Sequence, residues 1–467
     1  MNSAPSHPFG GGRPSGPPRN MDMDPIVVFW EITRACALKC RHCRATAQPK
    51  RHPMELTTEE CYRVMDGLAS FDQQPIVVLT GGDPFMRRDL FDIAAYGVGK
   101  GLRVSVSPSV TALVTRERLE RLVEIGVSAI SFSLDGSGSE LHDGFRGVPG
   151  SFDRTMECVP MAMEAGLGVQ LNTTVSRWNL EDLPDLATLV GSMGVPLWDL
   201  FFLVPTGRAL DADLPSAEVH ESTFNWVYEI SQSGGPRVKT TLGQPYRRVW
   251  LSRKLRDEGI DWREQTPEQL VSRWPGGAAT NDGRGIFFIS HLGSVYPSGF
   301  LPVLAGGVRR DDLVLLYRES PVFQSLRSSD ELGGKCGLCP FRKVCGGCRA
   351  RAFAMTGDYL AADPTCPFQP AGWDSRSEST VTAVWRSGSV ARDDIGRRTA
   401  DVRCVSAHPL GLAPRSKNPA HLVRRFACLL WGQFKGRPIL RSHQIRCETI
   451  HWMSGQALIS LPMRCYE

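Results

Sequence analysis

Short apolar runs alternate with amphipathic stretches along the first half of the chain. The runs are rich in β-branched and aromatic residues and are bounded by Gly, Pro or polar residues. They are Ile26–Trp30, Ile76–Leu79, Leu102–Val106, Ala129–Phe132, Val169–Leu171 and Leu200–Leu203. Runs of this kind are typical of strands that are buried on both faces of a parallel sheet.

The stretches between these runs carry helix start and stop signals. Thr57 to Glu60 forms a capping box that predicts a helix start. Leu119, Leu122 and Val123 recur at helical spacing before Gly126, which predicts a helix end. Six strand–helix units predict a parallel α/β fold with right-handed crossovers, either an open doubly wound sheet or a barrel. Six units are fewer than the eight of a closed barrel.

The remainder of the chain changes texture several times. A hairpin is predicted where Ile286–Ile289 and Ser294–Tyr296 flank a turn at Leu292-Gly293. The Pro/Gly-rich start of the chain cannot bury a core, so we predict that it is disordered. The expected organisation is a disordered leader, an α/β domain, a mostly helical connection, a cysteine-rich α+β extension and a poorly ordered basic tail, over residues 1–24, 25–210, 211–284, 285–372 and 373–467.

Composition narrows the class of protein. The 467 residues are 42% hydrophobic and 22% charged, as in ordinary globular proteins, and the net charge is +5. Residues 375–467 hold 13 Arg and 2 Lys against 3 Asp and 3 Glu, so the positive charge belongs to the tail and says nothing about partners of the core. No stretch approaches eighteen apolar residues, and no signal peptide is recognisable, which predicts a cytoplasmic protein without a membrane span.

Fourteen cysteines are many for this length, and reducing cytoplasm favours metal ligation over disulfides. Cys36, Cys40 and Cys43 lie in the loop after the first predicted strand, where parallel α/β folds bind ligands. Three thiolates can hold a [4Fe–4S] cluster with one open iron, or zinc with a distant fourth ligand such as His42 or His52.

The C-x3-C-x2-C spacing resembles that of the radical S-adenosylmethionine (SAM) superfamily. A second feature is Leu79-Thr80-Gly81-Gly82-Asp83-Pro84, which resembles the superfamily's GGE motif at the end of the second strand, with Asp83 where Glu is commoner. The resemblance implies a partial (β/α)6 TIM-like barrel, a [4Fe–4S] cluster on the three cysteines, and SAM bound near Gly81 to Pro84. It implies reductive cleavage of SAM and hydrogen abstraction from a substrate carbon.

Polar residues at later strand ends match the superfamily less specifically. Ser133 and Asp135 stand in a segment that resembles the family's SLDG and would face SAM or the substrate. Asn172 ends the fifth strand, and Arg208 follows the sixth. The alternative is that such residues only satisfy strand-end backbone groups. No catalytic side chain is assigned.

A second cysteine constellation lies in the C-terminal extension. On spacing alone it suits zinc or iron–sulfur equally; its residues are Cys336, Cys339, Cys345, Cys348 and Cys366. It resembles the SPASM extension of radical SAM enzymes, and the resemblance implies one auxiliary [4Fe–4S] cluster on all of these except Cys348, which is a spare thiol or an alternative ligand. Ser298 stands where the family usually has a cysteine, so a second auxiliary cluster is not expected. Cys61 and Cys158 are expected to be buried inert thiols.

The segment from Cys345 to Cys366 is similar to members that modify propionate or acetate side chains of heme precursors. A tetrapyrrole-like substrate would lose carbon dioxide or acetate, with Arg208, Arg349 and Arg351 available to pair with its carboxylates. The alternative is maturation of a ribosomally made peptide. The family also implies a flavodoxin- or ferredoxin-like electron donor. A third reading, from a different class, is a non-catalytic iron–sulfur or zinc protein whose tail binds nucleic acid, although the tail has no recognition motif.

Overall fold

The computed structural model describes residues 19–275, 280–374, 450–454 and 457–461. The chain divides into two compact units, Met1–Ser387 and Gly388–Glu467. In the second unit, β12 (Ile450–Ser454) pairs with β13 (Ala457–Leu461) as an antiparallel hairpin. Most of the leader and of the basic tail lies outside the described residues, so the disorder predicted for both stays a prediction.

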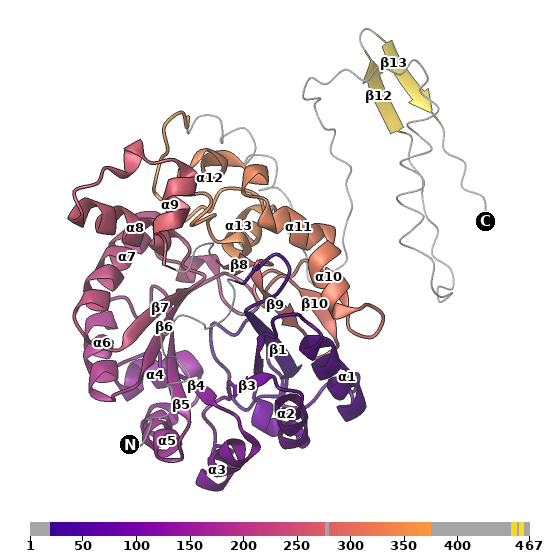
Figure 1. The fold of residues 1–467 in the computed structure, drawn as a ribbon, viewed down its shortest axis with the longest axis vertical. Helices are drawn as coiled ribbons and strands as arrows, with labels where there is room; N and C mark the ends of the chain where they lie inside the picture. Colours follow the sequence, from indigo (N-terminus) through magenta and orange to yellow (C-terminus); the bar gives the residue numbers. More distant parts are fainter. Residues whose placement is uncertain (1–18, 276–279, 375–449, 455–456, 462–467) are drawn as a thin grey trace. The chain divides into compact units, whose positions relative to one another are not determined.

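The first unit is built on a curved sheet with seven successive parallel strands (Figure 1). The strands are β1 (Val27–Thr33), β2 (Ile76–Gly81), β3 (Arg103–Val106), β4 (Ala129–Ser133), β5 (Gly168–Val175), β6 (Leu197–Phe202) and β7 (Arg237–Thr241). Their order in the sheet follows their order in the chain, and the edge strands do not pair to close the sheet. The fold is therefore α/β and a partial TIM-like barrel, as expected.

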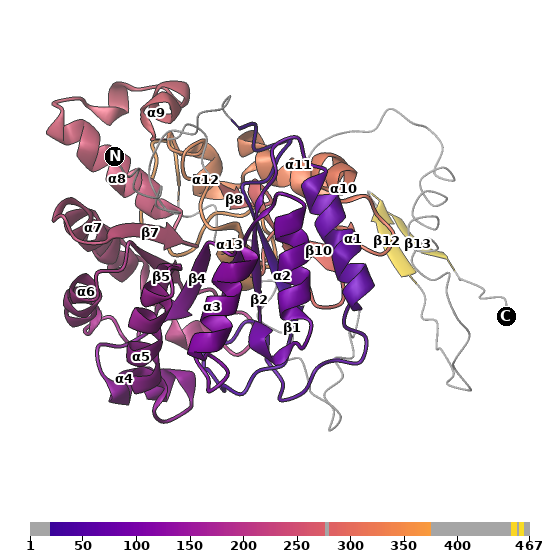
Figure 2. The same ribbon diagram turned by 60° about the horizontal axis from the view of Figure 1, so that its bottom comes forward.

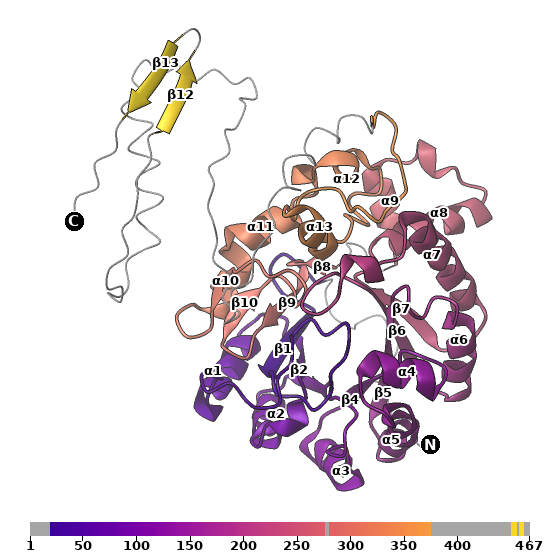
Figure 3. The same cartoon turned by 180° about the vertical axis from the view of Figure 1, so that it is seen from behind.

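Helices cover the outer face of this sheet (Figures 2 and 3). They are α1 (Thr58–Ala69), α2 (Leu90–Gly99), α3 (Arg116–Ile125), α4 (Ser139–Arg146), α5 (Ser151–Glu164), α6 (Leu183–Ser192), α7 (Ala217–Gln232) and α8 (Pro245–Asp257). Both predicted signals are confirmed: Thr57 and Glu60 form the capping box of α1, and Gly126 caps α3 with φ of 97°. Apolar side chains of strands and helices meet in one large core.

The C-terminal part of the first unit extends the same sheet beyond β1. β9 (Gly285–Ile289) pairs in parallel with β1, and β10 (Ser294–Tyr296) returns antiparallel to β9, which confirms the predicted hairpin. The other elements of this part are the short strands β8 (Asn281–Asp282) and β11 (Gly306–Gly307) and the helices α9 (Pro267–Arg273), α10 (Leu313–Glu319), α11 (Pro321–Arg327), α12 (Gly334–Leu338) and α13 (Arg349–Thr356).

Strand alternation separates an apolar outer face from a polar inner face. In β6, Trp198 and Leu200 pack under the helices, so Asp199 between them faces the barrel interior. Asp199 pairs with Lys239 on β7, with Nζ to Oδ2 at 2.9 Å, and accepts a hydrogen bond from Thr241. The inner face is therefore suited to a polar ligand.

Strand β7 was missed by the hydrophobic pattern. Its sequence, Arg237 to Thr241, is polar and partly exposed because it is the edge strand of the sheet. The stretch that was expected to be mostly helical therefore contains the helices α7, α8 and α9 and also a seventh parallel strand.

Candidate active site

The three clustered cysteines of the first motif face a common cavity. Cys36, Cys40 and Cys43 line a cavity of about 150 Å³ at the carboxyl ends of the strands. Cys36 and Cys40 are buried, and the Cys36 Sγ lies 3.2 Å from the hydroxyl of Ser109. The loop after β1 thus brings three soft ligands to one place, as the sequence predicted.

The loop is held by neighbouring backbone at close range. Gly82 donates its N–H to the carbonyl of Thr33 at 2.8 Å, and a Cβ on Gly82 would lie 2.3 Å from the carbonyl oxygen of Ala35. On the other side, a Cβ on Gly207 would lie 2.4 Å from the Cys43 carbonyl oxygen. Only glycine, which has no Cβ, permits these approaches. Gly82 therefore lets the end of β2, and Gly207 the loop after β6, pack directly against the cysteine loop.

Two arginines bring positive charge to the cavity. Arg146 and Arg208 line it, and the Nε of each is buried without a hydrogen-bond partner among the described residues; Nη2 of Arg208 is also unpartnered. Arg146 forms an ion pair with buried Asp135, and its Nη1 lies 3.7 Å from the Cys40 Sγ. Buried donors without partners require an acceptor, so the cavity suits an anionic ligand beside the thiols.

The surroundings of Cys36 and Cys40 favour the protonated thiol over the thiolate. Burial raises the pKa of Cys36 and of Cys40, although Arg146 partly opposes the effect at Cys40. Burial also lowers the pKa of His42 to about 4, so this imidazole is neutral at pH 7 and stacks on Phe145. Metal binding at these thiols must therefore release protons. His42 lines the cavity and His52 does not, which removes His52 as a distant fourth ligand.

The predicted SAM contacts divide into two groups. Gly81, Gly82 and Ser133 line the cavity. The other four predicted contacts do not line the cavity. The Asp83 carboxylate accepts hydrogen bonds from the Phe85 N–H and the Thr111 hydroxyl, and Pro84 begins a 3-10 helix. Asp135 pairs with Arg146 and accepts the Thr174 N–H, and the Asn172 side-chain oxygen accepts from the Gln170 amide. Asp83 and Asp135 position the cavity wall rather than present a carboxylate to it.

Two lining residues were not found from the sequence. Ser109 follows β3 and donates to the Gly82 carbonyl at 2.8 Å, which links the glycine motif to Cys36. Arg146 occupies the last turn of α4. A basic residue at a helix C-terminus is common for electrostatic reasons, so no local signal distinguishes Arg146. Both residues reach the cavity only through the folding of the sheet.

The buried Asp83 carboxyl gives a pH-dependent stability. Burial raises the pKa of Asp83 from its ordinary 3.8 to about 6. The folded protein therefore holds this proton more tightly than the unfolded chain, and its free energy of unfolding decreases as the pH rises through 6. The stability of Asp83→Asn relative to wild type should therefore increase by about 2 kcal/mol between pH 4.5 and 7.5. Urea unfolding of the metal-free proteins measures this. The exposed Asp185→Asn is the control, and a difference that is flat with pH for Asp83→Asn would contradict the interpretation.

The second cysteine constellation also gathers at one cavity. Four thiols line it: Cys336, Cys339, Cys345 and Cys366. Burial raises the pKa of Cys339 to about 12 and that of Cys345 well above its ordinary value. Backbone N–H groups already donate to the sulfurs, from Gly347 to Cys345 at 3.3 Å and from Asp363 to Cys336 at 3.4 Å. This donor set suits a four-thiolate metal centre.

Cys348 is separate from this cavity. Its side chain is fully buried, caps α13 and accepts the Arg351 N–H at 3.4 Å. Ser298, at the position where a further cysteine would be expected, is buried and accepts from the Phe300 N–H at 3.2 Å. The geometry therefore favours Cys348 as a spare thiol. Cys61 and Cys158 are buried in the main core, as predicted.

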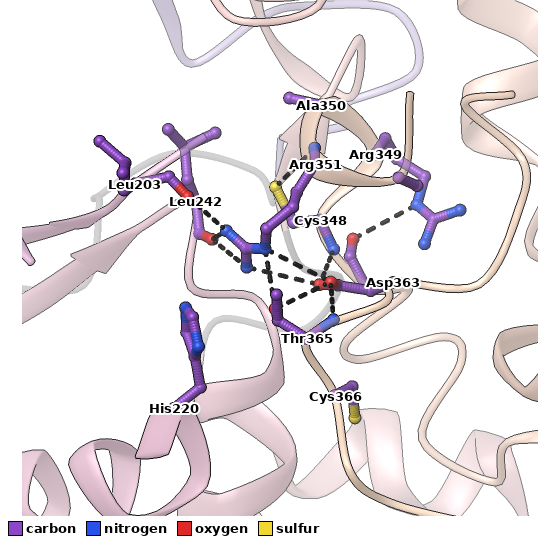
Figure 4. A network of polar contacts seen from close by, with 12 residues as sticks. Leu203, His220, Leu242, Cys348, Arg349, Ala350, Arg351, Asp363, Thr365 and Cys366 are labelled. Carbon is purple, nitrogen blue, oxygen red and sulfur yellow. Dashed lines mark hydrogen bonds and ion pairs between the residues drawn. The ribbon is translucent and has the colours of Figure 1, made fainter. Parts of the chain in front are cut away.

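Arg349 and Arg351 do not face a substrate, which corrects the expectation that they pair with substrate carboxylates. Arg351 is fully buried, forms an ion pair with Asp363 at 3.4 Å and donates to the carbonyls of Leu203 and Leu242 (Figure 4). Arg349 is buried and donates to the carbonyls of Tyr359 and Ala361. Both guanidinium groups tie the cysteine-bearing segment together, and Arg351 also joins it to the ends of β6 and β7.

Two negative findings concern the described residues alone. In them, no group of three or more His, Cys, Asp or Glu side chains already stands at metal-ligand geometry, so ligation at either cysteine cavity is a proposal. No helix in the described part of the chain is both long and apolar enough to span a bilayer.

Comparison with known proteins identifies relatives over most of the chain. Residues 30–190 match the model of the radical SAM superfamily. The AdoMet-dependent heme synthase of Oleidesulfovibrio alaskensis is 38% identical to this chain. The match covers 78% of this chain and 97% of the heme synthase. The PqqA peptide cyclase of Granulibacter bethesdensis is 28% identical, with 80% of this chain and 94% of the relative covered. The structure of Streptococcus suis SuiB bound to the precursor peptide SuiA has a TM-score of 0.57 at 16% identity, covering 74% of this chain and 76% of SuiB.

Proposed function

The chain belongs to the radical SAM superfamily and is an enzyme, and on that premise we propose that it modifies a side chain of a heme precursor. The observation that carries the proposal is the 38% identity to a relative named AdoMet-dependent heme synthase, covered over 97% of its length. This outweighs the non-catalytic alternative, because the first cysteine motif lies within residues 30–190, which match the radical SAM model.

We propose that Cys36, Cys40 and Cys43 hold a [4Fe–4S] cluster and that SAM binds beside it. When bound, these groups supply reductive cleavage of SAM and hydrogen abstraction from an unactivated carbon. Gly81 and Gly82 present backbone carbonyl groups to the ligand without a side chain in the way. Arg146 and Arg208, with their unpartnered Nε atoms, supply donors for a carboxylate.

The second cavity is proposed to hold one auxiliary [4Fe–4S] cluster on Cys336, Cys339, Cys345 and Cys366. The four thiols share a cavity, and N–H donors to their sulfurs are already in place, which supports this ligand set. The cavity lies beside the Arg351–Asp363 pair that fixes the segment to the barrel. The auxiliary centre would take up the electron released when carbon dioxide or acetate leaves the substrate.

The substrate carboxylates are proposed to meet cations on the inner face of the barrel. Lys239 is about half-exposed there although it pairs with Asp199. Arg44 follows the last cysteine of the first motif, pairs with Glu31 at 3.1 Å and lies over the Phe288 ring. These two side chains replace Arg349 and Arg351 in this role, because the latter pair is consumed by internal hydrogen bonds.

The test is anaerobic turnover with SAM, a chemical reductant and an iron-bearing, propionate-substituted porphyrin, followed by mass spectrometry. Loss of carbon dioxide or acetate from the porphyrin, together with formation of 5′-deoxyadenosine, is the expected result. SAM cleavage that leaves every porphyrin mass unchanged would contradict the substrate class. The 28% identity to a peptide cyclase then favours a ribosomally made peptide as the substrate.

Iron content separates the two readings of the second cysteine motif. Wild type should contain about eight irons per chain, and Cys345→Ala should fall to about four, because one of four ligands is lost. Cys348→Ala should keep the wild-type iron content, because its sulfur lies outside the cavity. Iron and sulfide analysis with electron paramagnetic resonance measures this. Equal iron loss in both variants, or zinc at the site, would refute the ligand set.

A further inference from the structure

A basic pocket adjoins the second cysteine cavity. Its volume is about 230 Å³, and it lies among α7, α8 and the Trp262 segment. Its walls include four arginines against one glutamate: Arg248, Arg253, Arg256, Arg263 and Glu221. We call these four arginines and the space between them the arginine pocket. Helices α7 and α8, which carry most of the lining residues, lie side by side (Figures 1 to 3).

The arginine pocket is separated from the cysteine cavity by a single layer of side chains. Arg248 and Phe368 line both spaces. Phe341 and Phe368 each follow a cavity cysteine by two residues, and both pack on Trp262, with ring centroids 5.0 and 5.7 Å away. A partner that occupied the arginine pocket would therefore approach the four thiols closely.

Two of the four arginines, Arg256 and Arg263, offer their charge to a partner, whereas Arg253 is held by Glu229 at 3.1 Å and by the Asn225 carbonyl. Arg256 is exposed, and its guanidinium group makes no ion pair or hydrogen bond with another described residue. Arg263 is mostly exposed and pairs only with exposed Asp261, at 3.3 Å. Exposed pairs of this type are weak and can be exchanged. Arg248 is buried and bound by Glu221 through both Nη atoms, but its Nε has no partner among the described residues.

We propose that the arginine pocket is the docking site for acidic side chains of a one-electron carrier protein. This deepens the proposed function, because it rests on an auxiliary cluster in the adjoining cavity. In each turnover the auxiliary cluster, reduced by the electron released from the substrate, would be oxidised by one electron, and the oxidised carrier would become one-electron reduced; no covalent bond would form or break in this transfer. Carboxylates match the unpaired guanidinium group of Arg256, the weakly paired one of Arg263 and the unpartnered Nε of Arg248, and basic surfaces steer acidic partners.

The experiment measures binding and electron transfer with an oxidised flavodoxin, an acidic FMN protein, as the probe. The Arg256→Glu/Arg263→Glu double variant should bind flavodoxin about tenfold or more weakly than wild type at low salt, and the difference should shrink at high salt. The rate at which the reduced protein reduces flavodoxin should fall in parallel. The matched control is Arg63→Glu/Arg121→Glu, which makes the same charge change at exposed arginines of α1 and α3, outside the pocket.

The outcomes separate this inference from the proposed function. Equal loss of binding in the double variant and its control would overturn the docking site, as would wild-type affinity in the double variant. Iron content and SAM cleavage with a chemical reductant, measured on wild type, test the proposed function separately. Selective loss of binding in a protein with about four irons would support the surface and contradict the auxiliary cluster.

Discussion

Replacing Cys40 by alanine is expected to abolish reductive SAM cleavage. Cys40 is one of three thiols at the first cavity and lies beside Arg146, so no other described cysteine can take its place there. With two ligands the site cannot retain its cluster, and 5′-deoxyadenosine formation should fall to the background of the assay. Chromatography of anaerobic reactions with a chemical reductant measures the product.

The control for Cys40→Ala is Cys158→Ala. Cys158 is a fully buried cysteine of α5 in the main core and lines neither cavity, so its loss should cost about 1 kcal/mol of stability without changing SAM cleavage. Cleavage at the wild-type rate by Cys40→Ala would refute the ligand assignment. Iron analysis of the same samples should show that Cys40→Ala loses the first centre and keeps the second.

Replacing Arg351 by methionine is expected to destabilise the protein by about 3 to 5 kcal/mol, because it leaves Asp363 charged and buried without its partner. Burial is the largest single influence on Asp363 and opposes its ionisation, but Arg351, Arg349 and the N–H donors of Cys348 and Thr365 together lower the pKa of that carboxyl. The substitution also leaves the carbonyls of Leu203 and Leu242 without a donor (Figure 4). Urea unfolding of anaerobic samples at pH 7 measures the loss.

A surface ion pair provides the comparison for Arg351. Arg116→Met removes the pairing of Arg116 with Glu164, in which both side chains are exposed, and should cost less than about 1 kcal/mol. The double variant Arg351→Met/Asp363→Leu should recover part of the stability, because the uncompensated charge is gone. A loss for Arg351→Met no larger than that for Arg116→Met would show that the buried pair does not hold the segment.

Loss of Arg351 should also weaken metal retention at the second cysteine cavity. Leu242, whose carbonyl accepts from Arg351, has a φ of 59°, a conformation that L-residues adopt at a cost. Helix α8 begins three residues later and carries Arg248, which lines the cavity. We therefore expect Arg351→Met to retain less iron at the second site than at the first. Electron paramagnetic resonance distinguishes the two losses.

The sequence by itself determined the architecture and the two cysteine motifs. Strands that are buried on both faces are recognisable in the sequence as dense apolar runs. The spacing of Cys36, Cys40 and Cys43 is a local feature of the sequence, so this motif was recognisable without coordinates. The exception, β7, is a polar edge strand, because an edge strand contacts water and needs no apolar run.

Only the tertiary structure decided what each polar residue does. Arg349 and Arg351 sit in a motif that suggested substrate carboxylates, yet chain closure buries both against carbonyls and Asp363. Asp83 and Asp135 were predicted to contact SAM or the substrate, but in the structure Asp83 binds Thr111 and Asp135 binds Arg146, a residue of the cavity wall. Whether a charge faces a ligand or a backbone depends on contacts between segments that are far apart in sequence, and no local pattern encodes those contacts.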